Sequence, residues 1–182
     1  MEFFGIFKGD EREDCIAERK PFQGKLPFNM EEIYDWNSHM IMLDSHPKHL
    51  LDTNSSKFRI GLNNFHGRPS APMFAKQIEA EMQYTFALHA DNREITNIAF
   101  TGFGPSSDSY PWHKDKMDVF LVQVLSTVKL KVEGVNNEEF FDFKPGDYIW
   151  IPRGTHHQVV PEISRATFSF GVEGDPDPSM YF

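Results

Sequence analysis

The chain of 182 residues contains a single cysteine, Cys15, which excludes an internal disulfide and a cysteine-based zinc cluster. It also lacks any apolar run approaching the roughly 20 residues that cross a bilayer as a helix. The first residues, MEFFGIFKGDERED, lack the basic start, long apolar stretch and small-residue cleavage site of a secretory signal. These absences predict a cytoplasmic protein with no membrane contact.

Basic residues are also scarce. The chain has 18 Lys and Arg against 27 Asp and Glu, which gives a formal net charge of −9. A general nucleic-acid binder needs a basic face to meet phosphates, so this charge argues against that class. An acidic chain would suit a basic partner or substrate, and it would equally suit plain solubility.

No internal repeat, low-complexity tract or long linker marks a domain boundary, so residues 1–182 are expected to form a single domain. Hydrophobic residues make up 40% of the chain, and its 18 Phe provide material for a substantial core. The pattern changes along the chain. Residues 1–93 are mixed, residues 94–172 are rich in strand patterns, and residues 173–182 form a tail.

Two segments of the first part have helical patterns, 30–40 and 71–90. In the second segment Pro72 lies near the first turn, where its missing N–H is harmless. Apolar residues then recur every four positions and form one stripe: Phe74, Ile78, Met82 and Phe86. We expect this helix to pack on the outside of a sheet, with a partner-binding helix as the alternative.

From residue 94 onward, short strand patterns alternate with turn residues. The expected strands are 93–103, 117–125, 128–134, 138–143, 146–152, 156–160 and 165–172. Their spacing of about ten residues favours an all-β barrel or sandwich over βαβ units. The segment FKPGD, 143–147, predicts a tight turn between two of these strands.

Candidate metal ligands lie near both ends of this strand-rich part. His113 and Asp115 are separated by one residue, so in an extended segment their side chains point to the same side. With His157 they would form a two-histidine, one-carboxylate set, which non-haem Fe(II) uses to bind O₂ and an organic cosubstrate together. Zn, Mn and Ni also accept these ligands. By itself the His-x-Asp triplet would equally fit a surface histidine beside a turn.

The residues around these ligands carry a family resemblance. Gly146, Pro152, Gly154 and His157 match the second cupin motif, G-x5-P-x-G-x-x-H. The segment 113–132 resembles the JmjC-type 2-oxoglutarate oxygenases, including their ribosomal-protein hydroxylase branch, and the combined match covers about 110–172. This resemblance implies a mainly β, double-stranded β-helix (a cupin or jelly-roll barrel) with the N-terminal helices packed on its outside.

The resemblance also implies a function. His113, Asp115 and His157 would hold Fe(II), with His156 as a flanking residue on the other face of its strand. The metal would bind 2-oxoglutarate and O₂, and the enzyme would be a hydroxylase-type dioxygenase. Members of the group act on protein side chains, on modified bases or on small molecules, and many of them form homodimers. The substrate of this chain is left open between a protein side chain and a small molecule.

The JmjC group usually binds the distal carboxylate of 2-oxoglutarate with a Lys or Arg on the second strand. Here that position is Val128, and alternation places Lys129 and Lys131 on the opposite face. A bulge at Ser126-Thr127 would reverse the two faces.

Arg165 and Thr167 offer a second anchor. They resemble the R-x-S/T pair of other 2-oxoglutarate oxygenases, and a guanidinium fork suits a carboxylate. The alternative places Ala166, Phe168 and Phe170 in the core, with Arg165 in water. Gln123 has the same parity as the first two metal ligands, and it would either line the cosubstrate pocket or satisfy backbone groups.

Aromatic and histidine residues complete the set of candidates. Tyr110, Trp112 and Trp150 could wall the pocket. The other histidines lack ligand-like spacing and are expected at the surface or in loops: His39, His46, His49, His66 and His89.

Two further functions remain open. One is a metal-dependent cupin that does not use 2-oxoglutarate, such as a small-molecule dioxygenase or isomerase, which Val128 favours. The other is a non-catalytic cupin-like binding protein.

Overall fold

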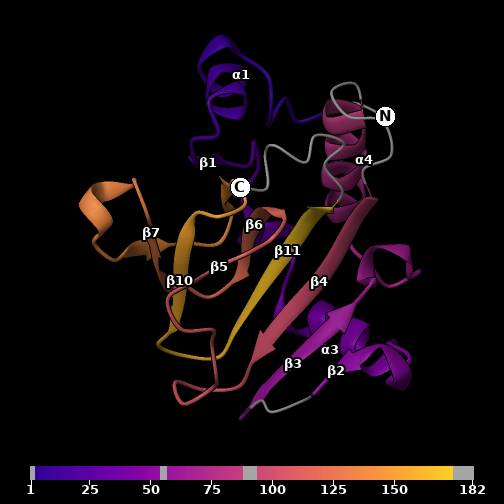
Figure 1. Ribbon diagram of the computed structural model, residues 1–182. Helices are drawn as coiled ribbons and strands as arrows, with labels where there is room; N and C mark the ends of the chain where they lie inside the picture. Colours follow the sequence, from indigo (N-terminus) through magenta and orange to yellow (C-terminus); the bar gives the residue numbers. More distant parts are fainter. Residues whose placement is uncertain (1–2, 54–56, 88–93, 174–182) are drawn as a thin grey trace.

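The computed structural model describes residues 3–53, 57–87 and 94–173, and within them two antiparallel β-sheets face each other (Figure 1). The larger sheet has seven strands in the order β1-β9-β6-β11-β4-β3-β2, and the smaller has four in the order β5-β10-β7-β8. This mainly β arrangement confirms the expected double-stranded β-helix, except that the two sheets do not close into a continuous barrel.

The elements have the following bounds. The larger sheet comprises β1 (Phe22–Lys25), β2 (Leu51–Asp52), β3 (Arg59–Asn63), β4 (Glu94–Gly102), β6 (Asp118–Leu125), β9 (Asp147–Ile151) and β11 (Arg165–Glu173). The smaller sheet comprises β5 (His113–Lys114), β7 (Val128–Val132), β8 (Phe141–Phe143) and β10 (His156–Pro161). The helices are α1 (Asp10–Ala17), α2 (Met30–Ile33), α3 (Trp36–Ser45) and α4 (Met73–Ala87), with short 3₁₀ turns at Lys48–Leu50, Phe65–Gly67 and Asn136–Glu138. Among the described residues, none of these helices has the length and apolar character needed to span a membrane.

The space between the sheets is filled by alternate residues of facing strands. One apolar cluster combines residues of the larger sheet (Val119, Leu121, Ile149 and Ile151) with residues of the smaller one (Val128, Leu130, Val132 and Phe143). Every residue of β6 is buried, because one face of that strand meets this cluster and the other meets the helical layer.

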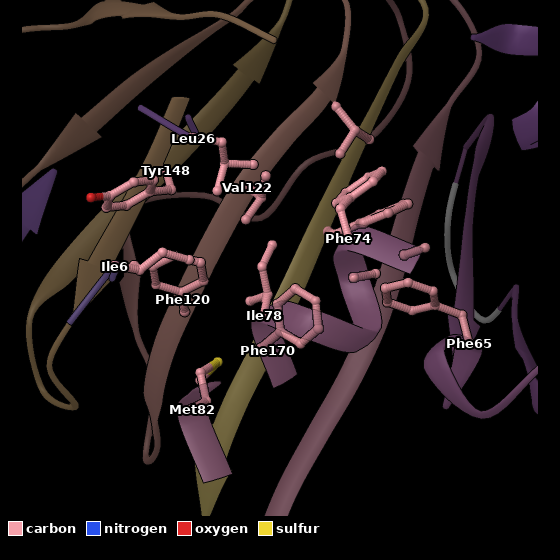
Figure 2. Close-up of a cluster of buried hydrophobic side chains, with 14 of the residues drawn as sticks. Ile6, Leu26, Phe65, Phe74, Ile78, Met82, Phe120, Val122, Tyr148 and Phe170 are labelled. Carbon is pink, nitrogen blue, oxygen red and sulfur yellow. The ribbon is translucent and has the colours of Figure 1, made fainter. Parts of the chain in front are cut away.

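The helical layer covers the outer face of the larger sheet. The four stripe residues of α4 are each at most 5% exposed. Figure 2 shows Phe74, Ile78 and Met82 of this helix directed toward side chains of the sheet, among them Phe120 and Phe170. The prediction of a helix that packs on the sheet is therefore confirmed, and residues 88–90 of the expected helix lie outside the described part.

Other sequence predictions differ from the structure. The seven strands expected after residue 94 are all present, but β1, β2, β3 and β5 were not anticipated. The segment 30–40 forms two helices, because Tyr34 is extended and the Asp35 carboxylate accepts a hydrogen bond from the Ser38 backbone N–H at the start of α3. The FKPGD turn is confirmed, and Gly146 has the positive φ of 89° that such a turn requires.

The prediction that the remaining histidines lie at the surface is wrong for His39 and His46, which are 0% and 4% exposed. His39 Nδ1 lies 3.0 Å from the Tyr34 hydroxyl and Nε2 lies 2.7 Å from Thr101 Oγ1. A neutral imidazole can donate one of these bonds and accept the other, which explains why it is tolerated in the core. Of the other histidines, His49 is exposed, His66 lies 3.0 Å from a Glu79 carboxylate oxygen, and His89 lies outside the described residues.

His39 should make the stability of the fold depend on pH. Burial lowers its pKa from 6.5 to about 4. Between these values the unfolded chain takes up a proton that the folded chain does not, so stability falls as the pH falls. Chemical denaturation with chelator present should show that the wild type loses on the order of 2 kcal/mol more than His39→Gln between pH 7.5 and 5.0. The exposed-site variant His49→Gln should keep the wild-type pH dependence, and equal curves for wild type and His39→Gln would contradict the prediction.

Candidate metal centre

Two short strand segments bring the candidate ligands together. β5 pairs with β10 in the smaller sheet, and this register places His113 directly opposite His157. Their ring centroids are 4.4 Å apart. Asp115 follows His113 by two residues and so reaches the same side. The local i, i+2 pattern and one cross-strand pairing therefore assemble the triad.

The ligand atoms converge on one point. His113 Nε2 lies 3.7 Å from Asp115 Oδ1, and His157 Nε2 lies 3.4 Å from Asp115 Oδ2. Nitrogen and oxygen atoms of all three residues lie within 4.8 Å of one another. His157 is nearly buried at 6% side-chain exposure, whereas His113 and Asp115 are 27% and 36% exposed. The triad is thus open on one side, as a site that admits a cosubstrate must be.

Backbone carbonyls orient both imidazoles. His113 Nδ1 donates to the Pro111 carbonyl at 2.7 Å, and His157 Nδ1 donates to the Thr155 carbonyl at 3.2 Å. A carbonyl only accepts, so Nδ1 of each ring carries a proton, and Nε2 is the ring atom that would bind a cation after losing any proton of its own. Burial alone would raise the pKa of Asp115, but hydrogen bonding to His157 and the charges of both imidazoles outweigh burial and lower it. The carboxylate is therefore in the ionised form that binds metal.

The turn before His157 is tied to the segment that carries Asp115, directly after β5. Gly154 has a φ of 79°, and its N–H donates to the Asp115 carbonyl at 2.9 Å. The Arg153 N–H donates to the carboxylate of the buried Asp118 at 2.9 Å. That carboxylate also forms a two-point ion pair with Arg19 of the N-terminal part. These bonds fix the turn that leads into His157, and the positive φ of Gly154 explains the glycine in it.

The triad opens into a cavity of about 590 Å³ between the sheets. Arg165, Thr167 and Ser169 of β11 line it, whereas Ala166, Phe168 and Phe170 belong to the core under the helices. The alternative that places Arg165 in water is therefore wrong, because this side chain is 3% exposed. The face of β11 opposite the helical core therefore points to the inside of the double-stranded β-helix and not to the solvent.

Arg165 is a buried cation with unused hydrogen-bonding capacity. Burial, assisted by the positive charge of Arg59, lowers its pKa to about 10, so the guanidinium remains charged at neutral pH. Its Nη1 lies 3.4 Å from the Thr167 hydroxyl oxygen. Within the described part of the chain its buried Nε has no hydrogen-bond partner. An anionic ligand in the cavity would supply that partner.

Gln123, on the neighbouring strand β6, holds Thr167 in place. It is fully buried, and its amide oxygen accepts a 2.7 Å hydrogen bond from the Thr167 hydroxyl. Its amide nitrogen donates to the carbonyls of Leu125 and Ser126 at 2.8 and 2.6 Å. Gln123 is not among the residues that line the cavity. Of the two roles considered for it, the satisfaction of backbone groups is the one observed, and the amide also orients Thr167.

Strand β7, where the JmjC group usually has its Lys or Arg, supplies no cationic anchor to the cavity. Val128, Leu130 and Val132 are fully buried between the sheets. Lys129 pairs with Asp142, and Lys131 lies over the Trp112 ring. The bulge considered at Ser126-Thr127 does not reverse this strand; an irregularity of register lies instead between β6 and β11, at Ala166 and Thr167.

Of the aromatic candidates, only Tyr110 lines the cavity. Trp150 is fully buried in the core under the helices. Trp112 stacks on His156, with ring centroids 5.6 Å apart, and His156 Nδ1 lies 2.9 Å from Glu133. His156 therefore flanks the triad, as the alternation predicted. Sequence analysis missed Arg59, a lining residue whose position depends on the unanticipated pairing of β3 with β4.

Metal affinity should distinguish the two adjacent histidines. His157→Ala removes a ligand atom and should weaken binding of Mn(II) or Co(II) by more than about 100-fold, whereas His156→Ala should change it by less than about threefold. Competition with a chromophoric chelator measures both affinities. Equal losses in the two variants, or no stoichiometric binding by the wild type, would contradict the assignment of the triad.

No protein-family model and no curated protein sequence matches this chain at a significant level. Solved structures do resemble it. The ribosomal oxygenase YcfD from Escherichia coli, in complex with cobalt and 2-oxoglutarate, is 16% identical over 92% of this chain and 52% of its own, with a TM-score of 0.59. A prolyl-4-hydroxylase from Pseudomonas putida is 13% identical over 89% of this chain and 96% of its own, with a TM-score of 0.61. This chain spans about half the length of YcfD. Because the identities are low, the similarity to both structures establishes a shared fold and no more.

Proposed function

We propose that this protein is an Fe(II)- and 2-oxoglutarate-dependent oxygenase that hydroxylates its substrate. The observation that carries the proposal is the buried Arg165, whose Nε lacks a partner and which lines the same cavity as the triad. A metal-binding triad alone would suit many reactions. A buried guanidinium in the cavity beside it suits a cosubstrate with a carboxylate at each end.

The residues present fit both the metal and the cosubstrate. Two imidazole nitrogens and one carboxylate on one side of an ion leave further coordination positions open, as an Fe(II) oxygenase requires. Arg165 and Thr167 would hold the distal carboxylate by charge-assisted hydrogen bonds. The similar E. coli YcfD structure is described as a ribosomal oxygenase with cobalt and 2-oxoglutarate, which supports this reading by analogy of fold.

The chemistry of the bound groups follows from these contacts. Fe(II) would let O₂ oxidise 2-oxoglutarate to succinate and CO₂, with one oxygen atom entering succinate and the other a substrate C–H bond. The contribution of the chain would be to place and shield the reactants. Val119 and Leu121 line the cavity and would exclude water. The bonds from Nδ1 of both histidines to backbone carbonyls would keep Nε2 directed at the metal.

The proposal predicts how 2-oxoglutarate affinity responds to substitution at the anchor. With Mn(II) bound and O₂ excluded, Arg165→Gln should weaken 2-oxoglutarate binding about 30- to 100-fold, because charged hydrogen bonds are lost from a buried site. Thr167→Val should weaken it less, by roughly fivefold, since it removes a neutral hydroxyl. Lys129→Gln makes the same charge change outside the cavity and should have no effect. Isothermal titration calorimetry measures all three.

The same titration separates the competing functions. A metal-dependent cupin that does not use 2-oxoglutarate would bind the metal but not the cosubstrate. A non-catalytic binding protein would hold no stoichiometric metal, and His113→Ala would change neither ligand binding nor stability. With Fe(II) and O₂, release of succinate and CO₂ should depend on 2-oxoglutarate. Metal-loaded wild-type protein that fails to bind 2-oxoglutarate would overturn the proposal.

A further inference from the structure

Gln123 and Thr167 lie directly opposite each other where β6 pairs with β11. The register is irregular beside them, because Ala166 is opposite Leu125 and Val124 is therefore an extra residue of β6. Such a bulge re-aims the side chains that follow it. Leu125, which plain alternation would put on the face of Gln123, belongs instead to the core under the helices. Gln123 is thus the last residue of β6 that shares the face of Thr167.

The orientation of the Gln123 amide is fixed by its partners. On one side lie two backbone carbonyl oxygens, that of Leu125 at 2.8 Å and that of Ser126 at 2.6 Å. Carbonyl oxygens only accept, so the amide nitrogen must lie on that side. Ser126 has a positive φ of 62°, and the two bonds therefore also fasten the tight turn that leads into β7. The amide oxygen is left facing Thr167.

This amide oxygen determines where the only hydroxyl proton of Thr167 points. It lies 2.7 Å from Thr167 Oγ1 and has no proton to give, so the hydroxyl donates to it. That proton is directed at β6 and is not available to a ligand in the cavity. The lone pairs of Oγ1 remain, and Arg165 Nη1 donates to this atom at 3.4 Å. Thr167 is therefore an acceptor toward Arg165.

The contact with Thr167 turns one edge of the Arg165 guanidinium toward the protein. The group is planar and rigid, so the placement of Nη1 also sets the direction of its other donors. Nε forms the other edge together with Nη2, and within the described segments this buried Nε has no hydrogen-bond partner. An edge with two parallel N–H donors matches the two oxygens of one carboxylate.

We propose that Gln123 is a positioning residue of the cosubstrate site, which directs the Thr167 hydroxyl away from the cavity and thereby sets the orientation of Arg165. The inference rests on the proposed function and refines it. Thr167 contributes through Arg165 and does not itself donate to the carboxylate. The edge formed by Nε and Nη2 would bind both oxygens of the distal carboxylate. A 2-oxo acid without a second carboxylate would gain nothing from this arrangement.

The first experiment compares two ligands that share the metal-binding end. With Mn(II) bound and O₂ excluded, Gln123→Leu and Thr167→Val should each weaken 2-oxoglutarate binding about fivefold, because each removes the support of Arg165. Binding of Mn(II), and of 2-oxobutanoate, which lacks the distal carboxylate, should change by less than about twofold. Gln23→Leu, the same change at an exposed position of β1, should affect none of the three. Calorimetry measures 2-oxoglutarate and the metal, and Mn(II) broadening of the methyl proton signal measures 2-oxobutanoate.

A general disturbance of the fold would give a different result. A parallel loss of affinity for Mn(II) or 2-oxobutanoate in Gln123→Leu would overturn the inference, and so would unchanged or tighter binding of 2-oxoglutarate. Absence of 2-oxoglutarate binding by the wild type would instead overturn the proposed function, on which the inference depends. Should Gln123→Leu not fold, Gln123→Met, which keeps an unbranched side chain in the site, takes its place.

A double-mutant cycle tests whether Gln123 acts through Thr167. The combined variant Gln123→Leu/Thr167→Val should lose about as much 2-oxoglutarate affinity as either single variant, about fivefold, because without the hydroxyl Gln123 has nothing to position. Independent contributions would multiply to about 25-fold, and that result would contradict the inference.

A measurement on the wild type tests which edge of the guanidinium receives the ligand. In protein loaded with diamagnetic Zn(II), the ¹⁵Nε–¹H signal of Arg165 is assigned by its loss in Arg165→Lys. This signal should move to lower field when 2-oxoglutarate binds and should stay in place with 2-oxobutanoate, because only the former brings a carboxylate to Nε. A signal that bound 2-oxoglutarate leaves unchanged would overturn the inference.

Discussion

The pairing of β11 with β4 and β6 is the constraint on which both faces of the larger sheet depend. Side chains of β11 alternate between two environments, so Phe168 and Phe170 complete the core under the helices while Arg165 and Thr167 line the cavity. A slip of one residue would exchange the two sets, placing a guanidinium against Phe65 and Phe74 and phenyl rings beside the metal ligands. Because that exchange would cost much free energy, the packing of the core fixes the position of Arg165, the proposed anchor.

Burial of Arg165, the proposed anchor, affects how strongly it would bind an anion. A row of polar contacts links Arg165 to Thr167, Thr167 to Gln123, and Gln123 to backbone carbonyls of β6 and the turn after it. The Thr167 hydroxyl and the Gln123 amide are therefore hydrogen-bonded without water. The guanidinium has already lost most of its hydration in the folded protein. A carboxylate that enters the cavity therefore gains a charge-assisted bond while removing little additional water from the cation.

The sequence predicted what short-range patterns encode. The seven predicted C-terminal strands follow from short runs of strand-forming residues separated by turn residues. The triad follows from an i, i+2 pair and from the resemblance of the segment before His157 to the second cupin motif. Alternation alone could not predict the inward position of Arg165, because both faces of β11 are covered and neither faces the solvent. The burial of His39 depends on Thr101, which is distant in sequence, and on the break at Asp35, where one side-chain cap divides the expected helix. Long-range pairing of short strands such as β3 leaves little local signal, so Arg59 could not be found in this way.

The candidate site combines residues from two parts of the chain that differ in how well sequence patterns reveal them. The residues of the triad and the anchor lie in the C-terminal part, where motifs are recognisable. Two contacts that complete the site come from the N-terminal part, which has no recognisable motif. Arg19 pairs with Asp118, which holds the turn before His157. Arg59, which is paired with Gly102, lines the cavity. Motifs of the C-terminal part therefore account for the candidate ligands, whereas contacts from the N-terminal part complete the cavity and the turn around them.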